Sequence, residues 1–529
     1  MRTIFTNCKI LTMNVAQPEA TALVLEGSKI LFVGNDAEAV SFKQSDSSII
    51  DGQGASLVPG FNDSHMHLLG LGVSMNAVDC RGLTGIAALK ERVKEKVQSV
   101  APGAVITGRG WDQNKWTDGR YATCQDLDEV APEHPVILTR ACGHVLVANS
   151  LALQQAGVDA NTMDIEGGSL DRDEQGQPTG VFRERAMGLV RHIIPASDAK
   201  AIREALQVAS QHAVSRGLTS VQTNDGGGAG WEDVVSAYHE LKLPLRANVQ
   251  FSMSAEQLAE FAERMHAANQ VIPEHVGVKT IKVMADGSLG ARTAALSEPY
   301  SDAPNEKGLS YYEQADLNKL IVEAHQAGFQ VAIHAIGDYT AEQAITAIEY
   351  AQGCDTSRRH RMVHCQVLRR DLVERMAKAN IIAEIQPVFL ITDLHWTESR
   401  VGKERLKFSY AWKSLLEYGV NCSGGSDCPV EVLDPLLGIG AAVTRADVTN
   451  WPEDGWLPQQ KLSVREAVAL FTVGSAYAEH METTKGLLKP GYLADMVLLS
   501  GDIEAVDPFA IKDLQIKLTM VNGMVVYKA

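Results

Sequence analysis

Two histidines one residue apart, His65 and His67, follow the apolar stretch "LVPGF" near the start of the chain. In an extended segment, residues i and i+2 point to the same side, so both imidazoles can face one point. Imidazole nitrogens are common ligands of zinc and related first-row metals. A pair this short also occurs by chance among core residues, so a metal site would need further ligands from elsewhere in the chain.

Further metal-capable side chains stand in later apolar runs. They are Lys282 in 277–287, His334 in 329–337, His364 in 359–366 and Asp427 in 419–427. Each one alone is weak evidence, because a single histidine on an apolar strand is usually a satisfied core residue. Their recurrence in one order, at the same end of successive runs, favours a shared metal site.

These residue types suit hydrolytic chemistry. A divalent metal held by imidazole and carboxylate ligands, with zinc as the expected ion, lowers the pKa of a bound water and polarises a substrate carbonyl. Asp427 is the candidate catalytic residue, because a carboxylate beside the metal can take the water proton and pass it to a leaving nitrogen.

Lys282 differs from the other candidate ligands. A charged ammonium is repelled by divalent cations, which favours the neutral amine. A neutral amine can react with CO₂ to give a carbamate whose two oxygens bridge two metals. The alternative is a salt bridge from Lys282 to Asp286 or another carboxylate.

The elements that must position these residues alternate short apolar runs with helical patterns. The predicted strands are the run before His65 and the runs 218–223, 245–253, 277–287, 329–337, 359–366, 380–387 and 419–427. Short buried strands joined by helices indicate parallel pairing, and eight of them predict an α/β fold with a closed (β/α)8 TIM barrel. Catalytic residues would then lie at the carboxyl ends of the strands. A doubly wound open sheet is the alternative.

Both chain ends have a different pattern, with short strands and glycine-containing turns. The segment "VNGMVV" near the C-terminus has the Asn-Gly pair of a tight hairpin. Neither end is long enough to form a stable sheet alone, so residues 1–58 and 480–529 are predicted to build one small β-sandwich. Residues 59–479 would form the barrel, with an inserted subdomain at about 70–195 after the first strand, because that connection is too long for an ordinary loop.

The motifs "PGFNDSHMH", "IKVMADGSLGARTAAL", "HAIGD", "GSDCPV" and "KGLLKPGYLADMVLL" together resemble the amidohydrolase superfamily of metal-dependent hydrolases. The resemblance spans nearly the whole chain and is closest to the branch that contains N-substituted formamide deformylases. It implies a barrel with a split β-sandwich, hydrolysis of C–N bonds in amides or cyclic amides, and a two-metal site with carboxylated Lys282.

Two points stay open within this resemblance. Asn62 stands where relatives usually carry an apolar or aromatic residue. A mononuclear site is the alternative to two metals: one ion would then be held by His65, His67, Asp427 and either His334 or His364, and Lys282 would stay an amine.

Several residues are candidates for substrate binding. Trp111 and Trp116 in "GRGWDQNKW" could wall a pocket or pack locally within the insertion. The other candidates are His144 in "ACGHVLVANS", Asp286 and Arg292 in "ADGSLGART" after Lys282, and Gln386 at the end of the seventh strand. Arg292 could hold a carboxylate or carbonyl oxygen with its planar guanidinium group, or form a structural ion pair.

The sequence predicts a metal-dependent hydrolase that cleaves an amide, N-formyl, N-acyl or cyclic amide bond of a small molecule. The alternatives are a deaminase or an ester or lactone hydrolase on the same site, and a non-catalytic regulatory protein on this fold. Deamination usually requires an additional acid after the fifth strand, and "HAIGD" supplies no glutamate there.

Composition limits the partners and the location. The net charge of −17 and the pI of about 5.4 argue against a nucleic-acid partner, which needs a basic face. No run approaches the length of a membrane span, and the N-terminus reads as that of a mature protein. The eight cysteines are scattered without a CxxC pair, which is typical of free thiols in the cytoplasm. A homo-oligomer is possible.

Overall fold

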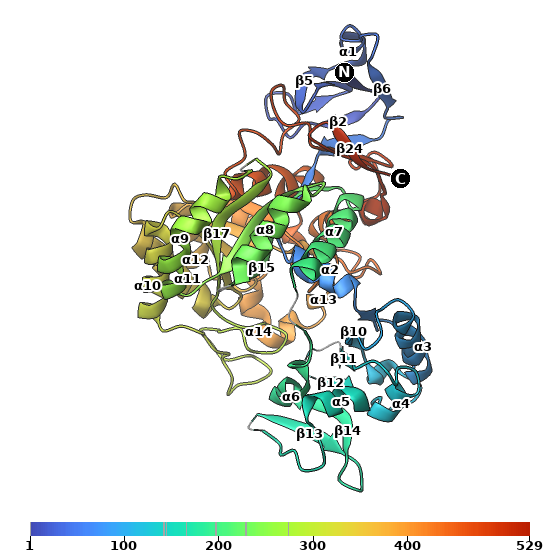
Figure 1. Cartoon of the computed structure of the whole chain (residues 1–529). Helices are drawn as coiled ribbons and strands as arrows, with labels where there is room; N and C mark the ends of the chain where they lie inside the picture. Colours follow the sequence, from blue (N-terminus) through green and yellow to red (C-terminus); the bar gives the residue numbers. More distant parts are fainter. Residues whose placement is uncertain are drawn as a thin grey trace. The chain divides into compact units, whose positions relative to one another are not determined.

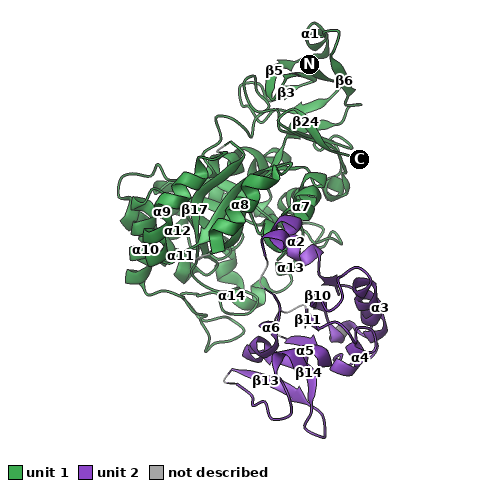
Figure 2. Ribbon diagram, in the orientation of Figure 1, with its two compact units in different colours: residues 1–70, 206–529 green, residues 71–205 purple. Residues whose placement is uncertain are grey.

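The computed structural model describes residues 2–140, 143, 145–165, 167–195, 198–227, 230–272 and 274–529. The chain divides into two compact units (Figure 2). The first consists of residues 1–70 and 206–529, and contains a barrel and the strands of both chain ends. The second consists of residues 71–205, which corresponds to the insertion expected after the first barrel strand.

Eight parallel strands form a nearly closed barrel in the first unit, and hydrogen-bonded neighbours follow the chain order. They are β8 (Phe61–Met66), β15 (Leu218–Gly227), β16 (Arg246–Ser252), β17 (Val276–Met284), β18 (Gln330–Ala335), β19 (Arg361–His364), β20 (Ile382–Ile385) and β21 (Cys422–Gly424). The predicted (β/α)8 barrel is therefore confirmed, and each predicted run overlaps one barrel strand.

Helices cover the outside of the barrel (Figure 1). The longer ones are α7 (Ala199–Ser215), α8 (Trp231–Leu241), α9 (Ala255–Asn269), α10 (Gln314–Gln326), α11 (Asp338–Gln352), α12 (Arg370–Lys378), α14 (Thr397–Arg405) and α16 (Pro435–Thr444). In α7, Ile202, Leu206 and Ala209 are buried at helical spacing. Gly217 follows α7 with φ +83, and a Cβ there would lie 3.0 Å from the ring of Phe61. This glycine lets the chain turn closely past the first strand.

Shorter helices complete the carboxyl-terminal third of the barrel. They are α13 (Leu390–Asp393), α15 (Trp412–Glu417), α17 (Val464–Ala469) and α18 (Ser475–Ala478). A short α2 (Leu68–Met75) follows β8 directly. The residues of β8 are buried along its whole length, as expected for a strand packed inside a barrel.

The strands of the two chain ends form two further sheets, of which the first is N-terminal and the second combines both ends. One has the order β5-β4-β1-β6 and the other β24-β23-β22-β7-β2-β3. Their bounds are β1 (Arg2–Thr6), β2 (Lys9–Leu11), β3 (Glu19–Ala20), β4 (Ala22–Glu26), β5 (Lys29–Gly34), β6 (Ser48–Asp51), β7 (Ser56–Pro59), β22 (Met496–Leu499), β23 (Ile516–Val521) and β24 (Met524–Lys528), with α1 (Asp36–Val40) between β5 and β6.

Figure 1 shows the blue N-terminal and red C-terminal strands side by side. The antiparallel pair of β7 and β22 joins the two ends, with Val58 opposite Val497. One apolar cluster contains residues of both ends, including Phe5 and Met520. The β-sandwich predicted from both chain ends is therefore confirmed. The boundaries predicted at residues 58 and 480 stay predictions, because the sandwich and the barrel belong to one compact unit.

The second unit is built on a six-stranded sheet of order β13-β14-β12-β11-β10-β9. Its elements are β9 (Val78–Asp79), α3 (Ile86–Val97), β10 (Ile106–Trp111), α4 (Cys124–Asp128), β11 (Val136–Arg140), β12 (Val145–Ala148), α5 (Ser150–Ala156), β13 (Gly168–Arg172), β14 (Pro178–Glu184) and α6 (Gly188–Arg191). Successive residues of β11 enter different apolar clusters, Val136 one and Ile137 the other. The sheet is thus covered on both faces.

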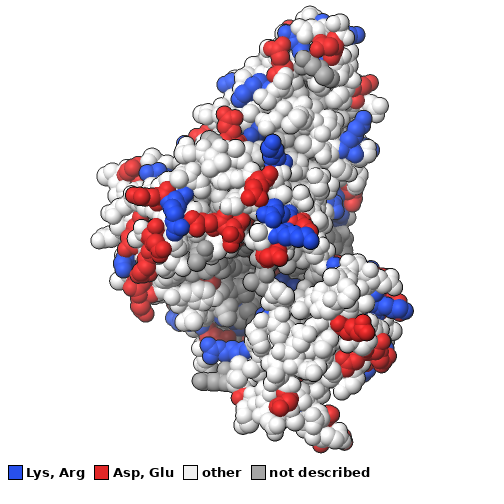
Figure 3. All heavy atoms as spheres, viewed as in Figure 1, with Lys and Arg blue, Asp and Glu red and all other residues white. Residues whose placement is uncertain are grey.

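Basic side chains on the face drawn in Figure 3 are interspersed with acidic ones, in keeping with the net charge of −17. Among the helices of the described residues, none combines the length and apolarity needed to cross a bilayer. No disulfide joins any of the cysteines that the structure describes.

Candidate metal centre

The first and last barrel strands, β8 and β21, meet at a contact that we call the barrel seam, formed by residues 61–67 and 422–428. The backbone N–H of Asp427 donates to the carbonyl of His65 at 2.7 Å, and that of His67 donates to the carbonyl of Cys428 at 2.7 Å. Gly425 permits this approach, because a Cβ there would lie 2.6 Å from the backbone nitrogen of His65. The seam therefore brings together residues from opposite ends of the barrel sequence.

The carboxylate of Asp427 lies between two imidazoles. Its Oδ1 is 3.4 Å from Nε2 of His65 and 3.1 Å from Nε2 of His67. The candidate ligand atoms of these three residues all lie within 4.8 Å of one another. Burial opposes ionisation, but hydrogen bonds and charge from His65 and His67 hold the pKa of Asp427 well below its ordinary value. The carboxylate is ionised at neutral pH, as a metal ligand must be.

Lys282 on β17 points its amine at the same place. Its Nζ lies 3.2 Å from Nε2 of His65, and the residue is only 2% exposed. Burial is the main cause that lowers the pKa of Lys282 to about 8. Asp286, the partner expected if Lys282 formed a salt bridge, instead accepts hydrogen bonds from the backbone N–H groups of Ala295 and Gly337.

Each of the four predicted histidine ligands has one ring nitrogen beside an oxygen. The oxygens are Oε1 of Glu384 at 2.9 Å from Nδ1 of His65, the carbonyl of Asn224 at 2.7 Å from Nδ1 of His67, the carbonyl of Gly287 at 3.0 Å from Nε2 of His334, and Oε1 of Gln386 at 2.8 Å from Nδ1 of His364. A carbonyl or carboxylate oxygen only accepts, so the neighbouring nitrogen carries the proton. The other nitrogen of His334 and of His364 then keeps its lone pair for a metal, whereas Nε2 of His65 and of His67 faces Oδ1 of Asp427, so that a metal would bind between these groups.

His334 and His364 extend the cluster from β18 and β19. Their ring centroids are 4.4 Å apart, and the ring of His364 is 5.7 Å from that of His65. Burial, followed by neighbouring positive charge, lowers the pKa of His334 to about 3 and places that of His364 well below its ordinary value. Both rings are therefore neutral at pH 7, the state in which imidazole binds a metal.

The donor set fits a divalent metal. His65, His67 and Asp427 form a compact group of nitrogen and oxygen ligands, and His334, His364 and Lys282 lie next to them. Imidazole and carboxylate donors suit zinc and related first-row ions. The structure thus brings all six predicted ligands to one end of the barrel.

Sequence reasoning missed the groups that hold these ligands in place. Glu384 on β20 is fully buried beside His65, and Asp63 on β8 accepts hydrogen bonds from the backbone of His65 and from Ser426. Burial raises the pKa of Asp63 to about 7. One signal was present: a carboxylate inside an apolar run such as "NIIAEIQP" is costly to bury unless it is paired.

Asn62, the unusual residue in the first-strand motif, lies on the buried side of β8. Its Nδ2 donates to Oε1 of Glu479 at 2.6 Å, and Glu479 pairs with Lys485 at 2.6 Å. The residue therefore belongs to a buried polar network and leaves the metal-ligand set unchanged.

Three of the predicted substrate-binding residues are engaged with other protein groups. Asp286 is fully buried and accepts backbone hydrogen bonds from the segment after β18. Arg292 makes a two-point ion pair with Asp302, at 3.0 and 2.9 Å. Gln386 uses Oε1 for His364. These contacts supply structural roles for all three, and their roles toward a substrate stay predictions.

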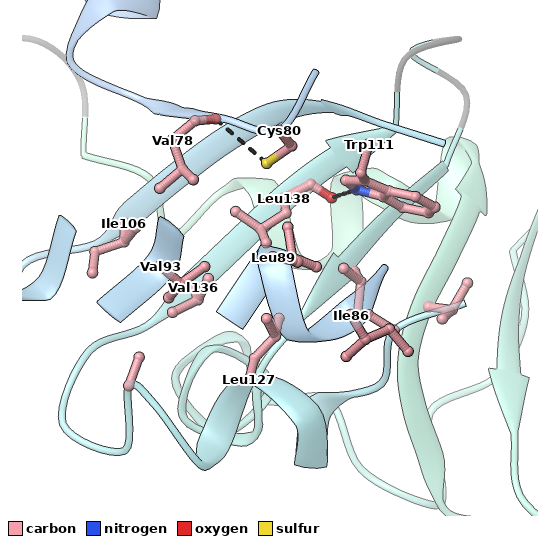
Figure 4. Packing of buried hydrophobic residues seen from close by; sticks show 14 of the residues in the cluster. Val78, Cys80, Ile86, Leu89, Val93, Ile106, Trp111, Leu127, Val136 and Leu138 are labelled. Atoms are coloured by element: carbon pink, nitrogen blue, oxygen red, sulfur yellow. Dashed lines mark hydrogen bonds between the residues drawn. The ribbon is translucent and has the colours of Figure 1, made fainter. Parts of the chain in front are cut away.

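Trp111 and Trp116 lie in an apolar core of the second unit (Figure 4 labels Trp111). Their ring centroids are 5.8 Å apart, and Nε1 of Trp111 donates to the carbonyl of Leu138 at 2.9 Å. Trp111 is fully buried. Both indole rings therefore pack locally within the second unit, which was the alternative to a place in a pocket wall. The remaining candidate, His144, lies outside the described residues.

Comparisons with known proteins agree with this geometry. A family model described as "Amidohydrolase family" matches residues 48–527. YtcJ of Bacillus subtilis (strain 168) is 36% identical over 483 residues, covering 90% of this chain and 89% of YtcJ. The N-substituted formamide deformylase of Arthrobacter pascens is 25% identical, covering 99% of this chain and 97% of that protein.

A solved structure extends the match. An uncharacterized metal-dependent hydrolase from Pyrococcus furiosus has a TM-score of 0.76 and 30% identity, covering 93% of this chain and 98% of that chain. The parallel barrel and the cluster of His65, His67 and Asp427 place this chain in the class of amidohydrolase-type barrels. The chain belongs to the amidohydrolase family, and the resemblance stated from its motifs is confirmed.

Proposed function

We propose that this protein is a metal-dependent hydrolase that cleaves a C–N bond in a small amide, N-formyl or N-acyl compound, or cyclic amide. The carrying observation is the ionised, buried Asp427 carboxylate between His65 and His67. The names of two relatives support the proposal, one a deformylase of N-substituted formamides and the other a metal-dependent hydrolase.

The chain's own residues have distinct tasks in this proposal. A divalent metal, zinc in our proposal, supplies Lewis acidity that activates water and polarises the carbonyl of the substrate. The imidazoles of His65, His67, His334 and His364 would form the metal site, and one nitrogen of each ring lies beside a protein oxygen. Asp427 accepts the proton of the attacking water through its carboxylate oxygen and delivers it to the leaving nitrogen.

Lys282 carries a carbamate in this proposal. Its neutral amine attacks CO₂, a new N–C bond forms and one proton leaves, which gives a carboxylate on the side chain. Burial and the lowered pKa of about 8 favour the neutral amine that this reaction requires. The two carbamate oxygens would serve two metals, whereas an unmodified amine would accompany a single metal.

The test uses the purified, zinc-supplemented protein with a panel of N-formyl amines, N-acyl amines, cyclic amides, esters and amino-heterocycles. Release of an amine together with a carboxylate from the amides is the expected result. Ammonia released from the heterocycles would indicate a deaminase, and turnover of esters alone would indicate an esterase. A metal-loaded protein without turnover on any class would favour a regulatory role, and each of these results would overturn the proposal.

A matched pair of variants links the activity to the site. Asp427→Asn keeps the size of the side chain but removes its basic carboxylate, so we expect a loss of turnover of at least about 100-fold, the range of a proton-transfer group. Glu232→Gln, in the exposed pair with Arg264, should keep full turnover. Equal activity of Asp427→Asn and the unsubstituted protein would remove Asp427 from the mechanism.

A further inference from the structure

Glu384 is a buried carboxylate that no part of the proposed reaction uses directly. It lies on β20 and is 0% exposed. One carboxylate oxygen, Oε1, lies 2.9 Å from Nδ1 of His65, and the other, Oε2, accepts a hydrogen bond from Nη1 of Arg361 at 3.0 Å. The carboxylate therefore lies between a candidate metal ligand and a buried guanidinium group.

Arg361 on β19 is itself fixed from several barrel strands. Its Nε donates to Oε1 of Gln330 at 2.8 Å, and its Nη1 donates to Oε1 of Gln222 at 2.5 Å. Arg361 is fully buried. Burying an ion pair is costly, and it stabilises a fold only when its remaining donors and acceptors are well matched. Here side chains from β15 and β18 bind Nε and Nη1 of the guanidinium group, which then holds Glu384, while Nη2 has no hydrogen-bond partner among the described residues.

The charge state of Glu384 fits this arrangement. Its Oε2 forms an ion pair with the buried guanidinium group of Arg361 at 3.0 Å, and an ionised carboxylate balances that charge. A lone pair on Nδ1 of His65 would face this negative charge at 2.9 Å, whereas a proton there would be attracted to it, which favours the tautomer with the proton on Nδ1. His65 Nε2 is then left with its lone pair, and this atom lies 3.4 Å from Oδ1 of Asp427 and 3.2 Å from Nζ of Lys282.

We propose that Glu384, held by Arg361, is a positioning residue that fixes the tautomer and the orientation of His65 for metal binding. This inference rests on the metal site of the proposed function. A carboxylate behind a metal-bound histidine orients the ring and makes it a stronger ligand, and loss of such a partner typically lowers metal affinity about 10- to 100-fold.

The substitution Glu384→Gln tests the proposal. The glutamine can accept from Arg361 through its oxygen, but its NH₂ group then faces His65 and forces Nδ1 to accept. The proton moves to the nitrogen that should bind the metal. We expect the zinc affinity, measured by competition with a chelator, to fall about 10- to 100-fold. An unchanged affinity would overturn the proposal.

A matched control comes from the polar network around Asn62. Glu479→Gln makes the same carboxylate-to-amide change in a buried residue, 7% exposed, whose partner is Lys485 and not a histidine. If Glu384 acted only through stability, both variants would lose stability and keep their zinc affinity. The proposal expects a loss of affinity in Glu384→Gln alone.

A second measurement needs no variant at Glu384 and so does not depend on its folding. In protein loaded with cadmium-113 and labelled with ¹⁵N-histidine, the His65 signals are assigned by their loss in His65→Asn. We expect metal coupling at Nε2 and a proton on Nδ1, whereas coupling at Nδ1 would overturn the proposal. Neither measurement uses turnover, so a failure of the amide-hydrolysis assay leaves this inference standing, and the reverse also holds.

Discussion

At the scale of single residues, His65 is the most connected member of the candidate metal centre. Its Nε2 faces Asp427 and Lys282, while its Nδ1 faces Glu384. The ring therefore links a group that would bind metal to a charged pair that would hold the ring. Substitution of a neighbour of Nε2 should change turnover or metal content, whereas substitution of Glu384 at Nδ1 should change metal affinity.

In our proposal, Lys282 decides how many metals the site holds. We expect Lys282→Ala to lower the metal content from two ions per chain to one, because the carbamate that would bridge them is lost. Metal analysis after dialysis measures the ratio directly. Lys485→Ala, which removes another buried lysine whose partner is Glu479, should leave the ratio unchanged. An unchanged ratio in Lys282→Ala would end the bridging role.

Asp393 allows a prediction on pH and stability. Burial raises its pKa to about 7, although the hydroxyl of Tyr410 donates to its Oδ2 at 2.5 Å. The folded state thus favours the protonated carboxyl, so its stabilising effect is present at low pH and is lost as the pH rises toward 7. Relative to Asp393→Asn, the unsubstituted protein should lose on the order of 1 kcal/mol per pH unit between about pH 4 and pH 7.

Urea unfolding at several pH values measures this difference. The control is Asp51→Asn, because hydrogen bonds from Gln53 and Asn7 lower the pKa of this exposed carboxyl. Its difference from the unsubstituted protein should be flat above pH 5. A flat profile for Asp393→Asn as well would show that Asp393 is ionised in the folded protein.

At the scale of elements, the barrel seam holds the site together. The segments of β8 and β21 contact each other through backbone hydrogen bonds of the candidate ligand residues themselves. The carboxylate of Asp63 also accepts hydrogen bonds from the backbone N–H and the hydroxyl of Ser426. The separation between His65 and Asp427 is therefore set by the pairing of two strands. A change in the backbone of the seam should alter metal binding without touching any ligand side chain.

Gly425→Ala tests the seam. The added methyl group would lie 2.6 Å from the backbone nitrogen of His65 and 2.9 Å from its carbonyl oxygen, so the strands must separate. We expect a loss of about 1–3 kcal/mol in unfolding free energy, typical of overpacking, together with weaker zinc binding. Gly188→Ala, where the added methyl group meets nothing within 4 Å, is the control. Normal zinc affinity in Gly425→Ala would show that the seam can relax.

The order of strands and the six metal-capable residues were predictable because both depend on local patterns. Apolar runs mark barrel strands, and candidate ligands stand at the same end of five of these runs. The partners of these ligands were not predictable in the same way. Glu384 on β20 contacts Arg361 on β19 and His65 on β8 only in the folded barrel. The spacing of these residues in the sequence does not predict their contact.

The substrate-binding candidates show the same limit. Arg292 and Asp286 stand in a glycine-rich loop that suggests a binding site, yet the structure gives both of them protein partners. Trp111 belongs to a core that forms from strands and helices of the second unit. A polar or aromatic residue in a loop has no periodicity that separates a structural contact from a ligand contact.

At the scale of the whole molecule, the first unit is joined by contacts between distant parts of the chain. Arg246 on β16 makes a buried ion pair with Asp495, at 2.8 Å, and Asp495 also accepts from the backbone N–H of Asn522. The carbonyl of the same Asp495 accepts from the backbone N–H of Gly60. One residue thus connects a barrel strand, the chain entering the barrel and the C-terminal hairpin.

Asp495→Asn should therefore destabilise the first unit strongly. It leaves the guanidinium group of Arg246 buried without its counter-charge, which typically costs about 3–5 kcal/mol. Denaturant unfolding measures the loss. Glu232→Gln breaks the exposed pair with Arg264, whose side chains are 48% and 49% exposed, and should cost less than about 1 kcal/mol. Equal effects of the two substitutions would contradict a central role for Asp495.

The barrel seam also has a consequence for biosynthesis. Asp427 follows His67 by 360 residues, and a ribosome adding about 5–20 residues per second needs roughly 20–70 s to make that stretch. During that interval the nascent chain carries its histidine pair without the carboxylate that completes the group. We therefore expect metal loading to follow the emergence of the last barrel strand, so the cell must supply the ion to a chain whose synthesis is nearly finished.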